Sequence, residues 1–235
     1  MKQYLYCLID DDVSTETLIY TGVSEGISGS VVNLYFPLAD FGLLVSDFAG
    51  ASVPVTRENV LKHAAVVNSF LPVTTPLPFR FGTLATDAEL ESFLTARGEA
   101  IRAKQALIRG CVEMSVKIIL ELKEPPSGQT AGEKPGTAFL SEKRREILGS
   151  EELASWLGGQ IGDSVRGTRI NTIVTDKLLL SVAHLVERES VERYRIKLKA
   201  ARAARPELKF LTSGPWPPYS FANIDLEFPT QFGVS

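Results

Sequence analysis

The order of the elements predicted for the second half of the chain is the feature that most restricts its fold. From Cys111 to Leu122 apolar side chains recur at every second position, which is the period of a strand with one buried face. The sequence then predicts, in order, a helix over 139–161, strands over 169–174 and 178–186, a helix from Ser190 to Pro206, and a strand over 207–211. The order β-α-β-β-α-β predicts a ferredoxin-like unit, an antiparallel sheet with both helices on one face.

The first half of the chain has a different order of elements. It predicts strands over 4–9, 31–36 and 41–48, the second ending at Pro37, and then two helices. The fold class is therefore α+β with two domains. We place an N-terminal domain at 1–110, the ferredoxin-like domain at 111–212 and a tail rich in proline and aromatic residues at 213–235.

Helix boundaries can be predicted from capping residues. Thr56 is expected to cap the first helix, with Asn59 partly in the role of a capping-box glutamate, and Pro72 to end it. The expected buried stripe of this helix consists of Val60, Ala64, Val67 and Leu71, with His63 at its edge. Asp87 and Ser190 are the expected caps of two later helices, and the helix over 139–161 is expected to break at Gly149 and Ser150, where Ser150 can cap it again.

Composition and charge exclude several classes of protein. The formal net charge is −3, so the chain as a whole is not a basic nucleic-acid binder. Its apolar stretches are interrupted by charges before reaching the roughly 18 residues that a membrane span needs, so we expect no membrane contact. Its two cysteines, Cys7 and Cys111, have no metal-binding spacing and are expected to be buried thiols of a cytoplasmic protein.

Residue patterns that carry catalysis are scarce in this chain. The histidines are His63 and His184, and neither stands in a metal-binding motif, so both are interpreted as structural. A glycine-rich stretch over 128–134 has the wrong spacing for a phosphate loop. We therefore predict no catalytic, metal or cofactor-binding residues, and no cofactor.

Two segments are unusual in composition. The first is Leu77–Thr83, in which Arg80 lies between two phenylalanines and can stack on a ring, with Phe81 and Gly82 following it. The second is Ser213–Phe221, in which prolines predict an extended, rigid conformation. Its candidate interaction residues are Trp216, Pro217, Pro218, Tyr219 and Phe221. This second segment either packs on its own chain or forms an aromatic docking edge for another protein.

The last predicted helix carries a stripe of positive charge. Its members are Arg193, Arg195, Lys197, Lys199, Arg202 and Arg205. A solvated helix face explains this stripe, and an acidic protein partner is the alternative. An RNA-recognition module would need exposed aromatic residues on the strand over 111–122, which has none.

Four blocks of the sequence resemble the GvpL/GvpF family of gas vesicle proteins. They are Leu77–Thr83 with the preceding His63 helix, Gly110–Lys117, Phe139–Arg144 and Gly214–Phe221, the last matching the family's GPWPPYxF ending. Met114 stands where an aromatic residue is common, and Phe139 where a tyrosine is usual. The resemblance extends over most of the chain.

The resemblance implies a role in assembling gas vesicles, the gas-filled protein shells that make cells buoyant. It implies a minor component that binds the small hydrophobic shell protein and other gas vesicle proteins, a modified ferredoxin-like second domain, and no catalytic residues. We expect the protein at the gas vesicle, in the cytoplasm. The rival hypotheses are a small-molecule enzyme of monooxygenase type, which would need a pocket near His184 or Arg80, and an RNA-binding module.

Overall fold

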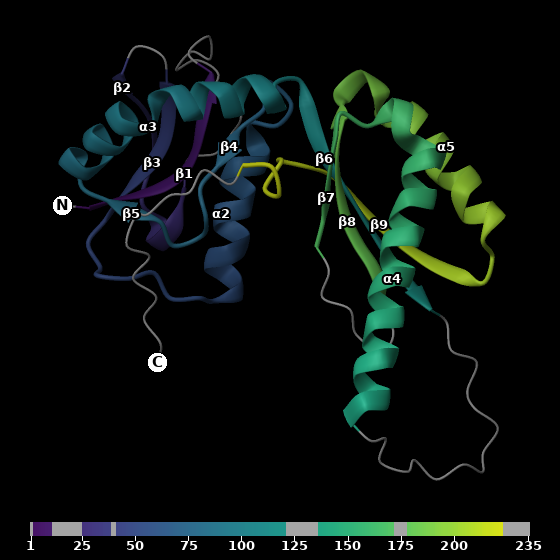
Figure 1. Cartoon of the computed structure of the whole chain (residues 1–235). Helices are drawn as coiled ribbons and strands as arrows, with labels where there is room; N and C mark the ends of the chain where they lie inside the picture. Colours follow the sequence, from purple (N-terminus) through teal and green to yellow (C-terminus); the bar gives the residue numbers. More distant parts are fainter. Residues whose placement is uncertain (1, 11–24, 39–40, 121–135, 172–177, 223–235) are drawn as a thin grey trace. The chain divides into compact units, whose positions relative to one another are not determined.

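The computed structural model describes residues 2–10, 25–38, 41–120, 136–171 and 178–222. It has antiparallel sheets and helices, which confirms the α+β class (Figure 1). The chain divides into two compact units, and each is described by itself. Unit 1 is Met1–Val112 together with Trp216–Ser235, and unit 2 is Glu113–Pro215.

Unit 1 is built on an antiparallel sheet of order β2-β3-β1-β4, with β5 also paired to β1. Its elements are β1 (Lys2–Asp10), the short helix η1 (Ile27–Gly29), β2 (Val32–Leu38), β3 (Phe41–Phe48), α2 (Arg57–Ser69), β4 (Leu77–Pro78), β5 (Leu84–Ala85) and α3 (Asp87–Ile108). The three long strands and two helices are those that the sequence predicts. The two-residue strands β4 and β5 are not predicted from the sequence.

Strand β1 is buried on both faces. Tyr4 to Ile9 have no exposed surface, and the register with β3 shifts between Leu5 and Cys7. Such a bulge lets neighbouring side chains share one face, and Tyr6 and Cys7 both join the core cluster that contains residues of α2. On the other face, Arg102 of α3 lies over the Phe41 ring, 5.9 Å from its centre. The two helices therefore cover opposite faces of the sheet.

Strand β2 passes through Pro37 and ends at Leu38, so the prediction that Pro37 ends it is wrong. Its register with β3 shifts between Tyr35 and Leu38. Proline has no N–H to donate and is tolerated on an edge strand or at a bulge. Among the described strands β2 pairs only with β3, so Pro37 meets both conditions.

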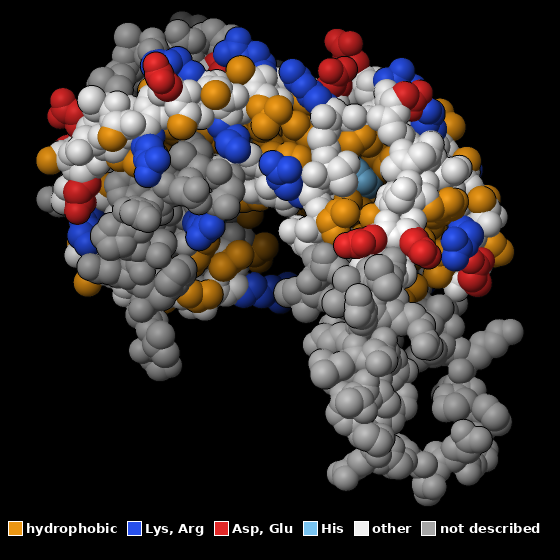
Figure 2. Space-filling model, viewed as in Figure 1, with side chains coloured by type: hydrophobic (Ala, Val, Ile, Leu, Met, Phe, Trp, Pro, Cys, Tyr) orange, Lys and Arg blue, Asp and Glu red, His pale blue; other side chains and the backbone are white. Residues whose placement is uncertain are grey.

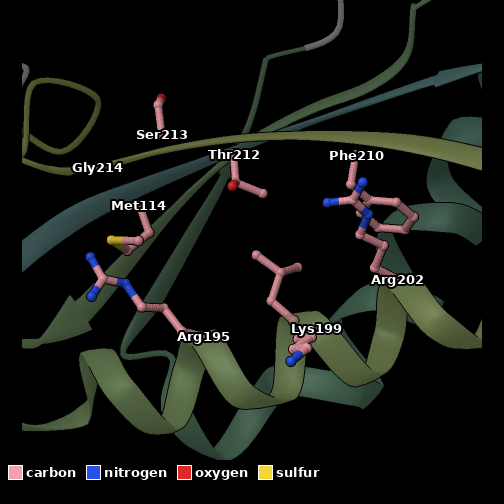
Figure 3. A pocket seen from close by; sticks show the side chains of 9 residues that line it. Met114, Arg195, Lys199, Arg202, Phe210, Thr212, Ser213 and Gly214 are labelled. Carbon is pink, nitrogen blue, oxygen red and sulfur yellow. The ribbon is translucent and has the colours of Figure 1, made fainter.

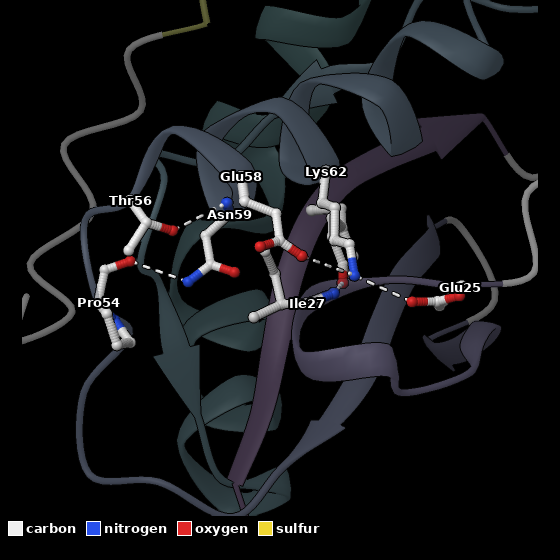
Figure 4. Close-up of polar contacts among 8 residues, drawn as sticks. Glu25, Ile27, Pro54, Thr56, Glu58, Asn59 and Lys62 are labelled. Atoms are coloured by element: carbon white, nitrogen blue, oxygen red, sulfur yellow. Dashed lines mark hydrogen bonds and ion pairs between the residues drawn. The ribbon is translucent and has the colours of Figure 1, made fainter.

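The N-terminus of α2 is capped by Thr56, as predicted, because its hydroxyl accepts from the Asn59 amide N–H (Figure 4). The Asn59 side chain does not complete a capping box. Its Nδ2 donates instead to the Pro54 carbonyl at 3.0 Å. One turn further along α2, Lys62 forms ion pairs with Glu25 and Glu58 on the surface.

The buried stripe of α2 differs from the predicted one. It consists of His63, Val66 and Val67, with Phe70 following the helix, whereas Val60 is 40% exposed. The helix is rotated about its axis relative to the prediction, so that His63 and not Val60 faces the core. The core cluster on β1 contains tyrosine hydroxyl groups, and one of them pairs with the His63 ring. The helix ends at Ser69, three residues before Pro72.

The N-cap residue of helix α3 lies one residue earlier in the chain than the sequence predicts. Thr86, not Asp87, is the N-cap, and it forms a capping box with Glu89. The Thr86 amide N–H and hydroxyl both donate to the Glu89 carboxylate, and these bonds lower the pKa of Glu89. Asp87 occupies the first helical position, where its charge is favourable to the helix dipole.

Unit 2 contains a sheet of order β7-β8-β6-β9, in which β7 and β8 are antiparallel. Its elements are β6 (Cys111–Leu120), α4 (Gly136–Ile161), the short helix η2 (Gly162–Ser164), β7 (Gly167–Ile170), β8 (Leu178–Glu187), the short helix η3 (Arg188–Ser190), α5 (Val191–Ala204) and β9 (Leu208–Trp216). Helices α4 and α5 contact each other and both contact β8. The sequence also predicts a loop over 124–136 and a turn over 175–177. Except for residue 136, both lie outside the described residues.

Three local predictions for unit 2 are wrong in full or in part. Helix α4 is continuous through Gly149 and Ser150, because helical hydrogen bonding tolerates an isolated glycine. Ser190 is the N-cap residue of α5, as predicted, but its side chain makes no capping hydrogen bond, and its hydroxyl accepts from Arg193 at 3.0 Å. Strand β9 extends five residues beyond Leu211, to Trp216, so it includes the first residues of the predicted tail.

Gly214 is required by the close approach of β9 to β6. Its φ is +119°, a conformation that side-chain-bearing residues rarely adopt. A Cβ atom at this position would lie 2.6 Å from the Glu113 carbonyl oxygen and 2.9 Å from the Met114 sulfur. The glycine of the GPWPPY motif is therefore dictated by packing within unit 2.

We predict that Gly214→Ala lowers the free energy of unfolding of unit 2 by at least about 2 kcal/mol, through the unfavourable φ and the clash with Glu113. Denaturant unfolding followed by Trp156 fluorescence measures this, because Trp156 packs against Phe210 of β9. Gly158→Ala is the matched control. Gly158 is exposed in α4 with open space around its Cβ position, so alanine there should stabilise by roughly 0.5–1 kcal/mol. Equal effects of the two substitutions would refute the packing argument.

Candidate functional site

The first candidate segment, Leu77–Thr83, lies along β1. Leu77 and Pro78 pair with β1 as the short strand β4, and the Phe79 amide N–H donates to the Tyr6 carbonyl at 2.9 Å. Further along, the Leu5 amide N–H donates to the Thr83 carbonyl at 3.0 Å. The segment is therefore held at both ends by the backbone of one buried strand.

A tight turn connects the two ends of this segment. The Thr83 hydroxyl donates to the Arg80 carbonyl at 2.7 Å, and the Thr83 amide N–H donates to the same oxygen at 3.2 Å. Gly82 adopts a φ of +86° with open space around its Cβ position, so glycine is needed for its backbone conformation alone. The turn leaves the Arg80 side chain exposed while Phe79 is buried.

The hydroxyl of Tyr4 joins this turn to helix α2. It accepts a hydrogen bond from the Gly82 amide N–H at 3.2 Å and lies 2.8 Å from His63 Nδ1. With its own proton on Nε2, the neutral imidazole accepts the Tyr4 proton at Nδ1 while the Tyr4 oxygen accepts from Gly82. The Phe81 ring lies edge-on to both Tyr4 and His63, with ring centres 6.3 and 5.9 Å apart.

Burial keeps His63 neutral. It lowers the pKa of His63 to about 4, while the Phe79 backbone acts weakly in the opposite direction. Nε2 has no hydrogen-bond partner of good geometry among the described residues. Burial also raises the pKa of Tyr4, opposed by the Gly82 hydrogen bond. Tyr4 and His63 have almost no exposed surface, so this pair holds the fold together and is closed to a substrate in this structure.

The second candidate segment follows the end of β9. Trp216 and Tyr219 are 44% and 40% exposed, whereas Phe221 and both prolines between them are buried. The Tyr219 amide N–H donates to the Pro217 carbonyl at 2.8 Å, and the Phe221 amide N–H to the Pro218 carbonyl at 3.0 Å. The expected extended conformation therefore ends at Pro218, because these two hydrogen bonds close a turn.

The structure brings parts of the two segments together in unit 1. Tyr219 lies close enough to Tyr4 to raise its pKa, and Tyr4 in turn bonds Gly82 and contacts the Phe81 ring. The tail residues from Trp216 onward belong to unit 1 by their contacts. Sequence reasoning missed Tyr4 as the centre of this arrangement, since nothing in a strand of apolar residues marks one tyrosine as a partner of a distant histidine.

The other histidine forms a similar pair in unit 2. His184 Nδ1 lies 2.8 Å from the Tyr194 hydroxyl, joining β8 to α5, and both side chains are buried. Burial lowers the pKa of His184 to about 4. Each unit thus contains a buried histidine whose ring nitrogen is paired with a tyrosine on another element.

The pocket that the enzyme hypothesis requires would lie near His184 or Arg80. A pocket of about 350 Å³ is present in unit 2, but neither residue lines it. Across the part of the chain that the structure describes, no cluster of three or more His, Cys, Asp or Glu side chains could hold a metal ion. Within the same residues, no helix is long and apolar enough to cross a membrane.

Comparison with known proteins identifies the family. The family model for gas vesicle synthesis protein GvpL/GvpF matches residues 2–223 of this chain. The chain belongs to this family. The resemblance noted in the sequence is thereby confirmed, and membership gives this GvpL/GvpF protein a role in the gas vesicle.

Relatives of both types are found. Gas vesicle protein F1 of Halobacterium salinarum is 25% identical over 213 residues, which cover 89% of this chain and 90% of that protein. Gas vesicle protein L of a Streptomyces species is 28% identical over 186 residues, which cover 69% of this chain and 68% of that protein.

Solved structures agree on the fold. The crystal structure of GvpF from Anabaena sp. PCC7120 matches with a TM-score of 0.76 and 17% identity, over 95% of this chain and 96% of that one. GvpF from Microcystis aeruginosa matches with a TM-score of 0.75 and 17% identity, over 95% of this chain and 99% of that one. The GvpL/GvpF protein described here therefore has the same overall α+β fold.

Removing the Tyr4 hydroxyl should destabilise unit 1. Tyr4→Phe leaves both His63 Nδ1 and the Gly82 amide N–H without their buried partner, so we expect a loss of about 1–3 kcal/mol in the free energy of unfolding. Tyr35→Phe is the matched control, because Tyr35 is 41% exposed on the edge strand β2, and it should change stability by less than about 0.5 kcal/mol. Unchanged stability in Tyr4→Phe would show that the pair is not structural.

The histidine pairs predict how stability depends on pH. Each folded-state pKa, about 4, lies below the ordinary value of 6.5, so between these values the unfolded chain binds a proton that the folded chain does not. The stabilisation that each neutral histidine contributes is therefore fully present above pH 6.5. On acidification below that value the free energy of unfolding falls, by up to about 1.4 kcal/mol per pH unit for each histidine. Unfolding of unit 1, followed by Trp216 fluorescence in a Trp156→Phe background, should show this fall between pH 6.5 and 5.

A pair of substitutions separates the two histidines in that experiment. His63→Gln should remove the pH dependence from the unit 1 transition, whereas His184→Gln should leave it unchanged. If the free energy of unfolding of His63→Gln still fell with pH as steeply as that of the wild type, the pH dependence could not be assigned to His63.

Proposed function

We propose that this GvpL/GvpF protein is a minor structural and assembly protein of the gas vesicle, required for vesicle formation. In this proposal it binds the small hydrophobic shell protein, together with other gas vesicle proteins, at the vesicle in the cytoplasm, and catalyses no reaction. Family membership supports the general role. The binding of the shell protein rests on the surface of the chain.

The observation that carries the proposed binding is the half-exposure of Trp216 and Tyr219. Large aromatic side chains on a rigid backbone are typical of the centres of protein interfaces, because they bury much area at a small entropic cost. Here the backbone between them is fixed by the buried residues Pro217 and Pro218, and after them by Phe221. The aromatic pair is therefore held out of the unit 1 core by neighbours that are part of it.

Further apolar side chains are exposed on unit 1. Tyr35 and Phe36 on the edge strand β2 are 41% and 43% exposed. Figure 2 shows hydrophobic side chains reaching the surface in the part of the chain it presents. An apolar shell protein would be a suitable partner for such surfaces, since burying them on binding is favourable.

We also infer that unit 2 is a modified ferredoxin-like domain and that the chain has the two domains and tail predicted from the sequence. The order β6-α4-β7-β8-α5-β9 and the sheet order β7-β8-β6-β9 support the ferredoxin-like arrangement. The contact of α4 with α5, both on β8, supports a single helical layer. The enzyme alternative needs a pocket at His184 or Arg80, whereas His184 is buried against Tyr194 and neither residue lines the pocket of unit 2 (Figure 3).

Replacing the aromatic pair tests the proposed binding. Trp216→Ala combined with Tyr219→Ala should lower the free energy of unfolding of unit 1 by no more than about 1.5 kcal/mol, since both side chains are half exposed. Capture of the purified shell protein by the full chain should fall at least about tenfold, because interface aromatics contribute most of the binding energy. Leu107→Ala on α3 is the control, because Leu107 is also apolar and is 41% exposed, and this variant should retain capture.

The same variants test the cellular role. A gas-vesicle-forming host without this protein should form no normal vesicles, and the wild-type chain should restore them. The double variant should restore far fewer vesicles than Leu107→Ala does. Normal vesicles in the deletion host would refute the proposed requirement, and normal capture by the double variant would refute the docking site alone.

A further inference from the structure

Helix α2 is apolar on its solvent side as well as on its core side. Over residues 60–67 every side chain is Val, Leu or Ala except Lys62 and the neutral His63. Val60 and Leu61 are nevertheless 40% and 56% exposed. A helix that is apolar on every side is normally buried on every side. The composition of α2 is therefore that of a helix with a partner on its outer side.

The helices α3 and α5 present a different kind of surface to solvent. Both expose charges of both signs, and their large exposed apolar side chains, Leu107 on α3 and Ile196 on α5, are isolated. Single exposed apolar residues are common and need no partner. The exposed charged residues include Glu91, Arg97, Glu99 and Arg102 on α3, and Glu192, Arg195, Lys199 and Arg202 on α5. On α2, by contrast, exposed apolar residues are adjacent.

The helical period places the exposed apolar residues on one side of α2. Successive residues are rotated by about 100° around the axis, so with His63 directed at the core Lys62 lies on one flank and Ala64 on the other. Val60, three residues before His63, lies on the Ala64 flank. The apolar face of α2 is defined here as Val60, Leu61, Ala64 and Ala65, all at least partly exposed.

The charged flank of α2 lies toward β3. Lys62 pairs with Glu25 at 2.9 Å, two residues before η1 (Figure 4). In η1 the Ile27 amide N–H donates to the Tyr6 hydroxyl, which also bonds Ser46 of β3. The strand order β2-β3-β1-β4 puts β4 on the other side of β1 from β3. The apolar face of α2 is therefore directed toward β4 and the turn that follows it.

This position connects the apolar face of α2 to the aromatic segment after β9. The Phe81 ring contacts the His63 ring of α2, with ring centres 5.9 Å apart, and it also contacts the Tyr4 ring. Tyr219 in turn lies close enough to Tyr4 to act on its pKa. Phe81, which is itself partly exposed, therefore links the apolar face of α2 to the aromatic pair of the proposed function.

The chemistry of the apolar face restricts what can cover it. The face has no charge to attract a nucleic acid or an acidic peptide. It also has no unpaired backbone groups for an added strand, because the N–H and C=O groups inside a helix bond one another. Its side chains form two rows four residues apart, Val60 with Ala64 and Leu61 with Ala65, and another helix packs between such rows. An apolar helix is therefore the element that fits.

We propose that an uncharged apolar helix of the small hydrophobic shell protein packs along the apolar face of α2, beside Trp216 and Tyr219. This inference rests on the proposed function and adds to it a second contact surface and the kind of element that covers that surface. Binding at both surfaces together buries more area than either buries alone, and specific interfaces need such area.

A charge introduced on α2 tests this docking. Leu61→Glu should lower capture of the purified shell protein by the full chain at least about tenfold, because the new carboxylate would be buried without a partner. The free chain should keep its circular dichroism and melting temperature, since Leu61 is 56% exposed and glutamate favours a helix. Leu107→Glu on α3 is the matched control, at 41% exposure, and should retain capture.

The outcomes distinguish this inference from the proposed function. If the wild-type chain captured the shell protein and Leu61→Glu did so equally well, docking on α2 would be overturned and binding at Trp216 and Tyr219 would stand. Absence of capture by the wild-type chain would overturn both. Equal losses in Leu61→Glu and Leu107→Glu would show a general effect of added charge and would overturn docking on α2 alone.

Photo-crosslinking tests whether the bound element is a helix. Benzoylphenylalanine is placed at Leu61 or at Ala65, which are one turn apart, about 6 Å along the axis of α2. In a helix packed along α2, the two crosslinked residues of the shell protein should be about four positions apart, whereas in an extended strand they would be about two apart. A spacing of two would overturn the proposal. Ala106, exposed on α3, is the control position and should give no crosslink.

Two other occupants of the apolar face would give different results. If a second copy of this chain covered it, light scattering would show a dimer that Leu61→Glu dissociates. If a lipid surface covered it, the chain would bind phosphatidylcholine vesicles, and Leu61→Glu would abolish that binding. Either result would overturn the proposal. We expect the same mass for the wild type and Leu61→Glu, and no binding of vesicles by either.

Discussion

The burial of β1 on both faces is the constraint on which unit 1 depends. A strand between two helical layers must place a close-packed side chain at every position, and Tyr4 to Ile9 do so without exposed surface. Two of these side chains are tyrosines, whose hydroxyl groups need partners when buried. Tyr6 bonds Ser46 and the Ile27 amide N–H, and Tyr4 bonds Gly82 and His63. The hydrogen bonding of β1 thereby fixes η1, α2 and the turn after β4.

The parts of the fold that follow from local patterns could be predicted from the sequence. Residue alternation in β6, the apolar run of β1 and the Thr56 cap each depend on neighbours in the chain. The rotation of α2 could not be predicted, because it depends on a tyrosine 59 residues away from His63. The length of β9 could not be predicted either. Its strand continues through a Gly-Pro sequence only because β6 lies alongside it.

The candidate residues show the same division. Sequence composition singled out the aromatic segment after β9 and the turn at Arg80, and it indicated that prolines stiffen the former. Which aromatic side chains are exposed was not predictable, since Trp216 and Phe221 differ in burial and not in chemistry. The basic stripe on α5 was interpreted as a solvated face, and Arg195, Lys199 and Arg202 are indeed exposed. These three residues also line a pocket, which becomes visible only when β9 is placed beside α5.

Strand β9 supplies residues to two surfaces of different chemistry. Phe210, Thr212 and Gly214 line the pocket of unit 2, to which α5 contributes basic side chains, and Trp216 ends the strand at the aromatic segment. The residues between them are held by the approach of Gly214 to the Glu113 carbonyl, which leaves no space for a side chain. Under the proposed function, a backbone fixed in this way would lose little further entropy on binding of a partner at Trp216, and preorganisation of this kind favours affinity. Gly214 thus contributes to both surfaces through the backbone, although it has no side chain to offer a partner.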